Sequence, residues 1–354
     1  MKEQEFAIVD LESTDLLAGG TQHYVELARA LQQRGVHLSF VGRPSLLDFL
    51  RKKFPNADTI ERDPRPLVDL TSLFSGFSDG RRSGASAVIS TSPYFNTFFY
   101  SLGFSLAKSR PLIVMMHHKQ RLRARVRFLG AYGLASYLFY LPARLSHYLP
   151  NVHALYNGTI PLRRPREYPY IMSRADIPCE GGKGIVKDVD VCFLGRMSKL
   201  KGFHEFIEVC EAVRREVPGL RVVAMGKKME LPVPEWIEHL GVVDEEKKYE
   251  TLSRSKVFLF PSHEEGFSIS TLEAMCKGAV PVLWDIPGYP FKNVVRVKEG
   301  DVAAASKAVI GLLKDGVKRE AMSKAAAEEA KKYTSIARIE EEAKLIAEVA
   351  GLAI

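Results

Sequence analysis

Apolar and polar positions follow one another in blocks that predict strands separated by helices. The run EFAIVDL at residues 5–11 is apolar, and after a polar loop residues 21–34 carry apolar positions at helical spacing. Strands that alternate with helices are expected to form a parallel sheet covered by helices. The first part of the chain is therefore predicted to be an α/β domain, with further strands expected at 36–42, 86–92 and 111–118.

The same alternation begins again after a stretch rich in proline, glycine and charge at 161–184. The apolar run VDVCFLG (189–195) precedes a helical pattern at about 202–215, and three more apolar runs follow it: LRVVAMG, VFLFPS and AVPVLW. We therefore expect a second α/β domain of the same kind. The predicted domains are 1–183 and 184–335, with a helix at about 336–354 as a candidate to pack back on the first domain.

Ligands of open parallel sheets bind beyond the carboxyl ends of the strands, so the loops after strands are the places to look for function. The most informative one lies in PSHEEGFSISTLEAMCKGAVPV, where Glu265 is in a loop and Glu273 is near the start of the following helix. Free backbone N–H groups and the helix dipole favour an anion there, and the carboxylates can accept hydrogen bonds from sugar hydroxyls. Alternatively, Ser270 and Glu273 form a capping box, which needs no ligand.

A second loop, FLGRMSKLKG, places Arg196 and Lys201 close to another helix start. Arginine offers a fork for two phosphate oxygens and lysine a point charge, a combination that suits a diphosphate leaving group without a metal. The alternative is that both are solvated loop residues, which is usual for these residue types.

Together these segments resemble the retaining GT-B glycosyltransferases, specifically glycosyltransferase family 4, over nearly the whole chain. The motifs are AGGTQHYVELARAL, YNGTIP, CFLGRMSKLKG, and EGFSISTLE followed by AMCKGAVPV. The resemblance implies an α/β GT-B fold with two Rossmann-like domains facing each other across a cleft. It also implies retaining, metal-independent transfer of a sugar, as in a hexosyltransferase, from a nucleotide diphosphate sugar to an acceptor.

The resemblance also implies roles for individual residues. Glu265 would face the hydroxyls of the donor sugar, Glu273 would hold the ribose, and Arg196 and Lys201 would neutralise the diphosphate. The other implied site residues are Gly266, Phe267 and Ser268, whose backbone would line the sugar pocket, Gly19 and Gly20 in a loop near donor phosphate or acceptor, and His117 at the sugar. Ser268 departs from the family, in which many members have glycine.

Other chemistries are disfavoured. The loop LLAGGTQ lacks the G-x-G-x-x-G of a dinucleotide-binding oxidoreductase, and there is no phosphate-binding G-x-x-x-x-G-K-[ST] motif. Four cysteines without a C-x-x-C pair argue against a zinc site or a disulfide framework. The D-x-D at Asp188 to Asp190 leads into a strand, at the end opposite the ligand edge, so we interpret it as the solvated start of that strand. We therefore expect no metal and no cofactor besides the donor.

Basic residues are concentrated at 101–150, which hold eight bases and no acid. Within this stretch, 119–129 (KQRLRARVRFL) reads as a basic helix with Leu122, Val126 and Leu129 on one face. Such a helix can lie on an anionic membrane or meet a phosphorylated acceptor, or it can pack on the sheet by its apolar face. Nucleic acid is disfavoured, because the nearby aromatic residues do not alternate with the bases.

The longest uncharged apolar run, 128–143, is shorter than the roughly 20 residues that a spanning helix needs. The first residues carry acids and lack a basic region before an apolar stretch, so we expect no secretory signal. We therefore expect a cytoplasmic enzyme, with the inner face of the membrane as a candidate place of association. The acceptor is expected to be a glycan, a lipid-linked molecule or another small molecule. The alternative is a catalytically silent nucleotide-sugar-binding protein of the same fold.

Overall fold

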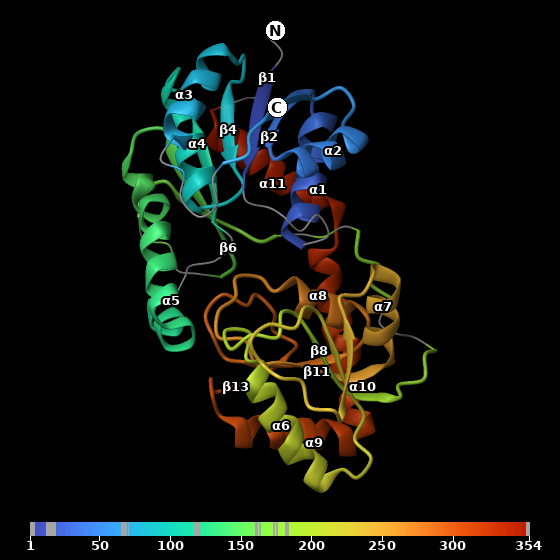
Figure 1. The fold of residues 1–354 in the computed structure, drawn as a ribbon. Coiled ribbons are helices and arrows are strands. Elements are labelled where there is room, and N and C mark those ends of the chain that lie inside the picture. The colour runs from blue at the N-terminus through green and yellow to red at the C-terminus, as the bar shows by residue number, and fades with distance from the viewer. Residues whose placement is uncertain are drawn as a thin grey trace. The chain divides into compact units, whose positions relative to one another are not determined.

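The chain forms two compact α/β units, each with its own parallel sheet (Figure 1). The first unit consists of Met1–Lys119, Ala135–Arg174 and Ile336–Ile354, and the second of Gln120–Leu134 and Ala175–Ser335. Neither unit is one continuous stretch of sequence. The computed structural model describes residues 4–11, 19–64, 69, 71–116, 121–159, 162, 164–172, 174, 176–180 and 184–351.

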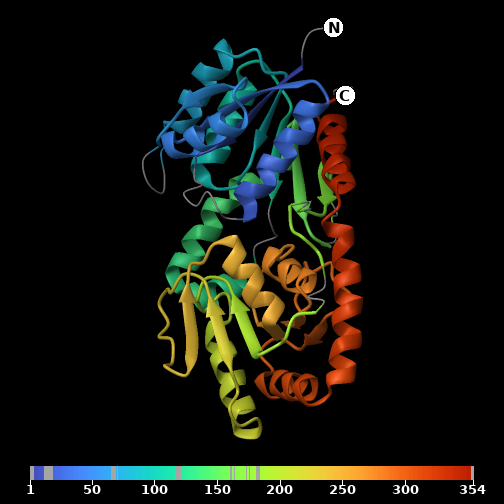
Figure 2. The same ribbon diagram turned by 90° about the vertical axis from the view of Figure 1, so that its right-hand side faces the viewer.

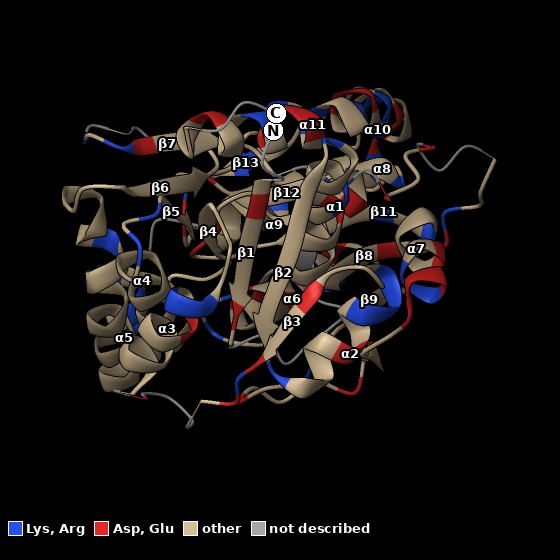
Figure 3. Cartoon of the chain, turned by 90° about the horizontal axis from the view of Figure 1, so that it is seen from above, with Lys and Arg blue, Asp and Glu red and all other residues tan. Residues whose placement is uncertain are grey.

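The sheet of the first unit has the strand order β3-β2-β1-β4-β5-β6-β7, and neighbouring strands are parallel. Figure 3 shows β1, β2 and β3 side by side. The central strands β4 and β5 are buried over their whole length, as expected where helices cover both faces of a parallel sheet. The strands are β1 (Gln4–Asp10), β2 (Val36–Gly42), β3 (Asp58–Glu61), β4 (Ala87–Ser90), β5 (Leu112–Met116), β6 (Val152–Asn157) and β7 (Glu167–Tyr170).

The helices of this unit include the last helix of the chain, which packs against the first (Figure 2). His23 on the first helix and Glu342 on the last are both buried, and the His23 Nε2 to Glu342 Oε1 distance is 2.9 Å. The helices are α1 (Gly19–Gln33), α2 (Pro44–Lys53), α3 (Ser72–Arg82), α4 (Phe95–Leu106), the 3-10 helix η1 (Ser146–Tyr148) and α11 (Ile336–Val349).

The sheet of the second unit has the order β10-β9-β8-β11-β12-β13, again with parallel neighbours. In Figure 1, α6 and α9 lie side by side next to this sheet. The strands are β8 (Val189–Leu194), β9 (Val222–Met225), β10 (Ile237–Gly241), β11 (Ser255–Phe260), β12 (Val280–Trp284) and β13 (Val295–Val297). The helices are α6 (Phe203–Glu216), α7 (Glu245–Arg254), α8 (Ile269–Cys276), α9 (Val302–Lys314), α10 (Gly316–Ala330) and the 3-10 helix η2 (Lys331–Tyr333).

The predicted α/β class is confirmed, and strands lie in every run that the apolar pattern identified. The pattern missed the interior strand β6, and it also did not identify the edge strands β3, β7, β10 and β13. The edge strands have three to five residues each, and several of their side chains are partly or fully exposed. A short strand with one solvated edge carries little periodic signal.

The basic segment is helical from Leu122 onward, as predicted, but the face that carries Leu122 and Val126 is exposed. Helix α5 (Leu122–Leu145) bends at Gly130, whose φ of 57° is left-handed. Leu122 and Val126 are exposed, whereas Arg125 is buried. The alternative in which Leu122 and Val126 pack this helix on the sheet is therefore wrong, because the ion pair of the buried Arg125 with Glu264 fixes the opposite face. Among the described residues, no helix combines the length and the apolar character needed to cross a bilayer.

Candidate active site

Two predicted site residues from separate loops form an ion pair in the second unit. Lys201 Nζ lies 2.5 Å from Glu265 Oε1, and the two side chains are only 20% and 10% exposed. Lys201 precedes α6, in the loop that follows β8, and Glu265 lies between β11 and α8 (Figure 1). Because β8 and β11 are parallel neighbours, their following loops meet at the same edge of the sheet.

Gly202 allows these two loops to approach closely. It is the N-cap of α6 and has a left-handed φ of 71°. A Cβ at this position would overlap the backbone carbonyl of Pro261, which follows the last residue of β11. A glycine is therefore required both by the backbone conformation and by the contact.

The loop before α8 ends in a strained residue that caps the helix. Ser268, the N-cap, has a φ of 64°, which explains why glycine suits this position, and its Oγ accepts a hydrogen bond from the Thr271 N–H. The capping box predicted at Ser270 and Glu273 is wrong, because the helix begins at Ile269, before Ser270. Glu273 instead accepts a hydrogen bond from Lys248 Nζ at 2.6 Å.

The remaining predicted residues of this loop region differ in exposure. Arg196 follows β8 and is exposed. Gly266 is buried. The Phe267 side chain is also buried and packs against Phe291 and Tyr333, with ring centroids 5.2 and 5.4 Å away. Its side chain thus belongs to the core, and its backbone is the part left to line a pocket.

Two of the predicted residues of the first unit are described. Gly19 and Gly20 are the first residues of α1, which follows β1 in the chain. They therefore begin a helix after a strand, the type of position where backbone N–H groups are available to an anion. His117 lies outside the described residues.

Sequence analysis missed a group of buried ions next to Glu265. Glu264 is paired with Arg125, and the Arg125 Nη2 to Glu264 Oε1 distance is 2.7 Å. His263 lies between two carboxylates, with its Nε2 2.7 Å from Glu205 and its Nδ1 2.9 Å from Glu299. Arginines four residues apart, at 121 and 125, and adjacent acids in a loop were the available signals.

His204, Glu205 and His263 are also the kind of group that can hold a metal. Their ligand atoms lie within 4.8 Å of one another. Both ring nitrogens of His263 are already within hydrogen-bonding distance of carboxylates. We therefore interpret the group as an ion network and assign no metal to it.

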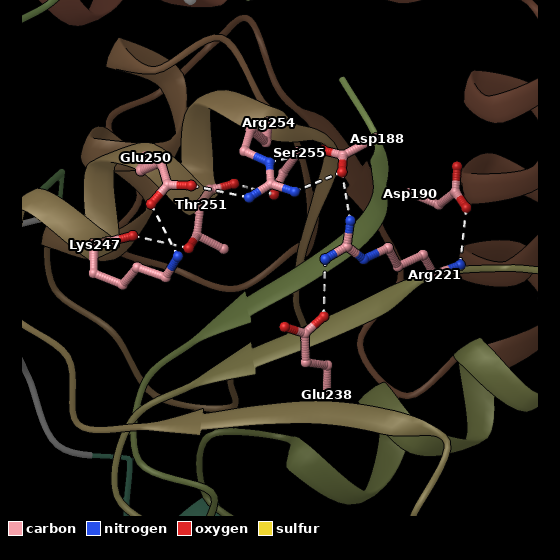
Figure 4. Close-up of polar contacts among 9 residues, drawn as sticks. All are labelled: Asp188, Asp190, Arg221, Glu238, Lys247, Glu250, Thr251, Arg254 and Ser255. Carbon is pink, nitrogen blue, oxygen red and sulfur yellow. Dashed lines mark hydrogen bonds and ion pairs between the residues drawn. The ribbon is translucent and has the colours of Figure 1, made fainter. Parts of the chain in front are cut away.

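Cations neutralise both acids of the D-x-D motif at the start of β8, and Figure 4 shows the two arginines that bind Asp188. Asp188 is bound by Arg221 and by Arg254, the latter with Nη2 2.5 Å from Asp188 Oδ2. The hydrogen bond from Arg254 holds the pKa of Asp188 well below its usual range. Asp190 pairs with Lys256 at 2.7 Å. The motif thus lies at the amino end of the strand and away from the loops that carry Lys201 and Glu265.

A cavity of about 840 Å³ also lies away from these loops. Its lining includes Cys179 and Lys187, which precede β8, and Arg319 and Ser323 on α10. None of the predicted donor-site residues lines it. The ion pair and the helix start, rather than this cavity, therefore define the candidate site.

The segment that contains the ion pair of Lys201 with Glu265 matches a known protein family. Residues 183–329 match the family model of the glycosyl transferases group 1. The matched segment is less than half of the chain. The match confirms the resemblance to glycosyltransferases for this segment, whereas membership of family 4 and the retaining mechanism stay predictions. The matched segment contains Arg196, Lys201, Glu265 and Glu273.

Solved glycosyltransferases share the fold of the whole chain. HepE of Anabaena, crystallised with UDP and glucose, superposes with a TM-score of 0.71 at 12% identity, over 98% of this chain and 99% of HepE. Sucrose-phosphate synthase from Thermosynechococcus elongatus superposes with a TM-score of 0.75 at 14% identity, over 98% of both chains. The predicted GT-B fold is confirmed.

Sequence relatives overlap with only part of the chain. The GDP-mannose:cellobiosyl-diphosphopolyprenol alpha-mannosyltransferase of Xanthomonas oryzae pv. oryzae is 28% identical over 109 residues, which are 27% of this chain and 29% of that protein. The alignments span 16–29% of the length of the curated relatives that the chain matches.

Proposed function

We propose that the chain is a retaining glycosyltransferase that moves a hexose from a nucleotide diphosphate sugar to an acceptor. The observation that carries this proposal is the pair formed by Lys201 and Glu265 beside the start of α8, inside the group 1 segment. A lysine can neutralise the negative charge of a diphosphate, and a carboxylate accepts hydrogen bonds from sugar hydroxyls. The dipole of α8 adds further positive potential at the start of that helix.

The chemistry follows from where charge develops. When the bond between the anomeric carbon and the diphosphate breaks, its electron pair stays on the diphosphate. Lys201 and Arg196 would neutralise that charge, so the proposal requires no metal for the leaving group. The acceptor oxygen bonds to the same face of the sugar, and its proton passes to the departing phosphate oxygen, which gives retention. Glu273 would hold the ribose in place of Lys248.

We propose a lipid-linked or otherwise anionic acceptor, presented at the cytoplasmic face of a membrane. The name of the matched mannosyltransferase indicates a diphosphopolyprenol-linked acceptor. In this chain, the exposed face of α5 before Gly130 carries Leu122 and Val126 beside Arg123 and Arg127. Apolar residues mixed with bases favour an anionic lipid surface.

Liposome flotation tests this second proposal. The chain should float with vesicles that contain anionic lipid and not with neutral ones. Replacing Arg123 and Arg127 with glutamate should abolish flotation. Equal and negligible binding to both vesicle types would refute the proposal.

The transferase proposal is tested first by thermal shift with UDP, GDP, ADP and their sugars, because a ligand bound only by the folded state raises its stability. Turnover is then measured with the donor that binds. Lys201→Ala, Glu265→Ala and Arg196→Ala should each lower turnover by roughly 100-fold or more. Lys199→Ala, an exposed lysine of the same loop, is the control. Saturable binding without turnover would instead indicate a silent nucleotide-sugar-binding protein.

A further inference from the structure

The residues just before Glu265 are held by arginines that lie far away in the sequence. Arg125 donates two hydrogen bonds to Glu264 Oε1, from Nε at 3.0 Å and from Nη2 at 2.7 Å. The side chains of Arg125 and Glu264 are 8% and 1% exposed. The Arg121 backbone N–H donates to Glu264 Oε2 at 2.8 Å, and Arg121 Nη1 donates to the His263 carbonyl at 2.8 Å. The backbone and the side chain of this segment are thus both fixed.

His263 is fixed on its remaining sides. Its ring stacks on Phe128, with centroids 3.9 Å apart and planes inclined by 23°. Its two nitrogens meet Glu205 of α6 and Glu299, and Glu299 is in turn bound by Arg121, with Nη2 to Oε2 at 2.9 Å. One face of residues 121–128 therefore ties the segment that precedes Glu265 to α6, the helix that follows Lys201.

We propose that residues 121–128 are a positioning element that holds Glu265 opposite Lys201, with Arg125 as its main positioning residue. The proposal rests on the proposed function for the role of Glu265. Arg125 would act on Glu265 through the loop, because it fixes Glu264 and Glu265 is the next residue in the chain. Without Arg125, the Glu264 carboxylate would be buried without its charged partner and would turn toward water, which would displace Glu265.

A purely structural role predicts something different. If Arg125 only anchored α5, its loss would lower overall stability and weaken every ligand alike. A positioning role predicts a selective effect, because Glu265 faces the sugar while the nucleotide is held elsewhere. The affinity for a nucleoside diphosphate should survive, and the additional affinity that the sugar contributes should be lost.

The experiment compares Arg125→Leu with the milder Glu264→Gln, which keeps the size of the side chain. Arg215→Leu, an exposed arginine near the end of α6, is the control. Hydrogen exchange of the peptide at 261–268 should become at least about 10-fold faster in both variants, and exchange of β9 should not change. Unchanged exchange of the 261–268 peptide in both would overturn the proposal.

Calorimetry then measures Kd for a nucleoside diphosphate and for its sugar, at a temperature where each variant is folded. The expected result is a loss of about 10-fold for the nucleotide sugar and less than 2-fold for the nucleotide. Equal losses for the two ligands would show a structural role and overturn the proposal. If the loop exchanges faster but the unaltered chain binds no nucleotide sugar, the proposed function fails and the positioning of the loop stands.

Discussion

Replacing Gly202 with alanine tests the geometry of the candidate site most directly. The added Cβ would meet the Pro261 carbonyl oxygen well inside 3.0 Å, a distance that real Cβ atoms essentially never fall below. The oxygen is backbone, so the two loops must separate by roughly 1 Å, and a displacement of that size can cost about 100-fold in rate. The left-handed conformation costs a further ~1–2 kcal/mol of stability.

Gly219→Ala is a matched control. Gly219 has a φ of 74°, close to the 71° of Gly202, but a Cβ there would meet nothing within 4 Å. Both variants should therefore lose about 1–2 kcal/mol from the backbone conformation. Gly202→Ala should lose about 1–3 kcal/mol more from the steric overlap.

Urea denaturation measures the free energy of unfolding, and turnover is measured with the donor identified by the thermal-shift screen. We expect turnover to fall by roughly 100-fold for Gly202→Ala and to stay within about 2-fold for Gly219→Ala. Similar turnover in the two variants would refute the reasoning that the Gly202 contact sets the distance between Lys201 and Glu265.

Three further predictions concern stability. Gly103→Ala should lower the free energy of unfolding by about 1–3 kcal/mol, because its Cβ would overlap the Leu73 carbonyl where α4 contacts α3. Gly311→Ala in α9 meets open space and should raise the free energy of unfolding by about 0.5–1 kcal/mol, and urea denaturation measures both. Glu342→Leu removes the buried partner of His23 and should cost about 1–3 kcal/mol in the same assay, more than Glu342→Gln. Burial alone would raise the pKa of Glu205, but the neighbouring His204 and His263 have the larger effect and lower it from 4.5 to about 2. This depressed pKa stabilises the fold at neutral pH, and the contribution is lost as the pH falls, so the melting temperature should fall more steeply for the natural chain than for Glu205→Gln between about pH 5 and pH 3.

The sequence predicted the architecture because strands buried on both faces carry an unbroken apolar signal. The pairing of Lys201 with Glu265 also follows from topology, since each residue lies in a loop after a strand and those strands are neighbours. Such an inference needs only the order of strands, which the α/β pattern and the resemblance supply.

The errors arose where a specific interaction outweighed a local pattern. Leu122 and Val126 are spaced for burial, but the ion pair of Arg125 with Glu264 turns the opposite face inward. The capping signature at Ser270 was misleading because Ser268, in a left-handed conformation, caps the helix two residues earlier. Neither effect can be read from spacing, because each depends on a contact or a torsion angle that forms only in the folded chain.

The interleaving of the two units along the chain has a consequence for biosynthesis. Domains usually fold in order from the N-terminus as they leave the ribosome. Here, all residues of the second unit have been translated by Ser335, while the first unit still lacks its last helix. The nascent first unit must therefore wait for residue 342 before His23 meets this buried carboxylate, so the part made first is completed last.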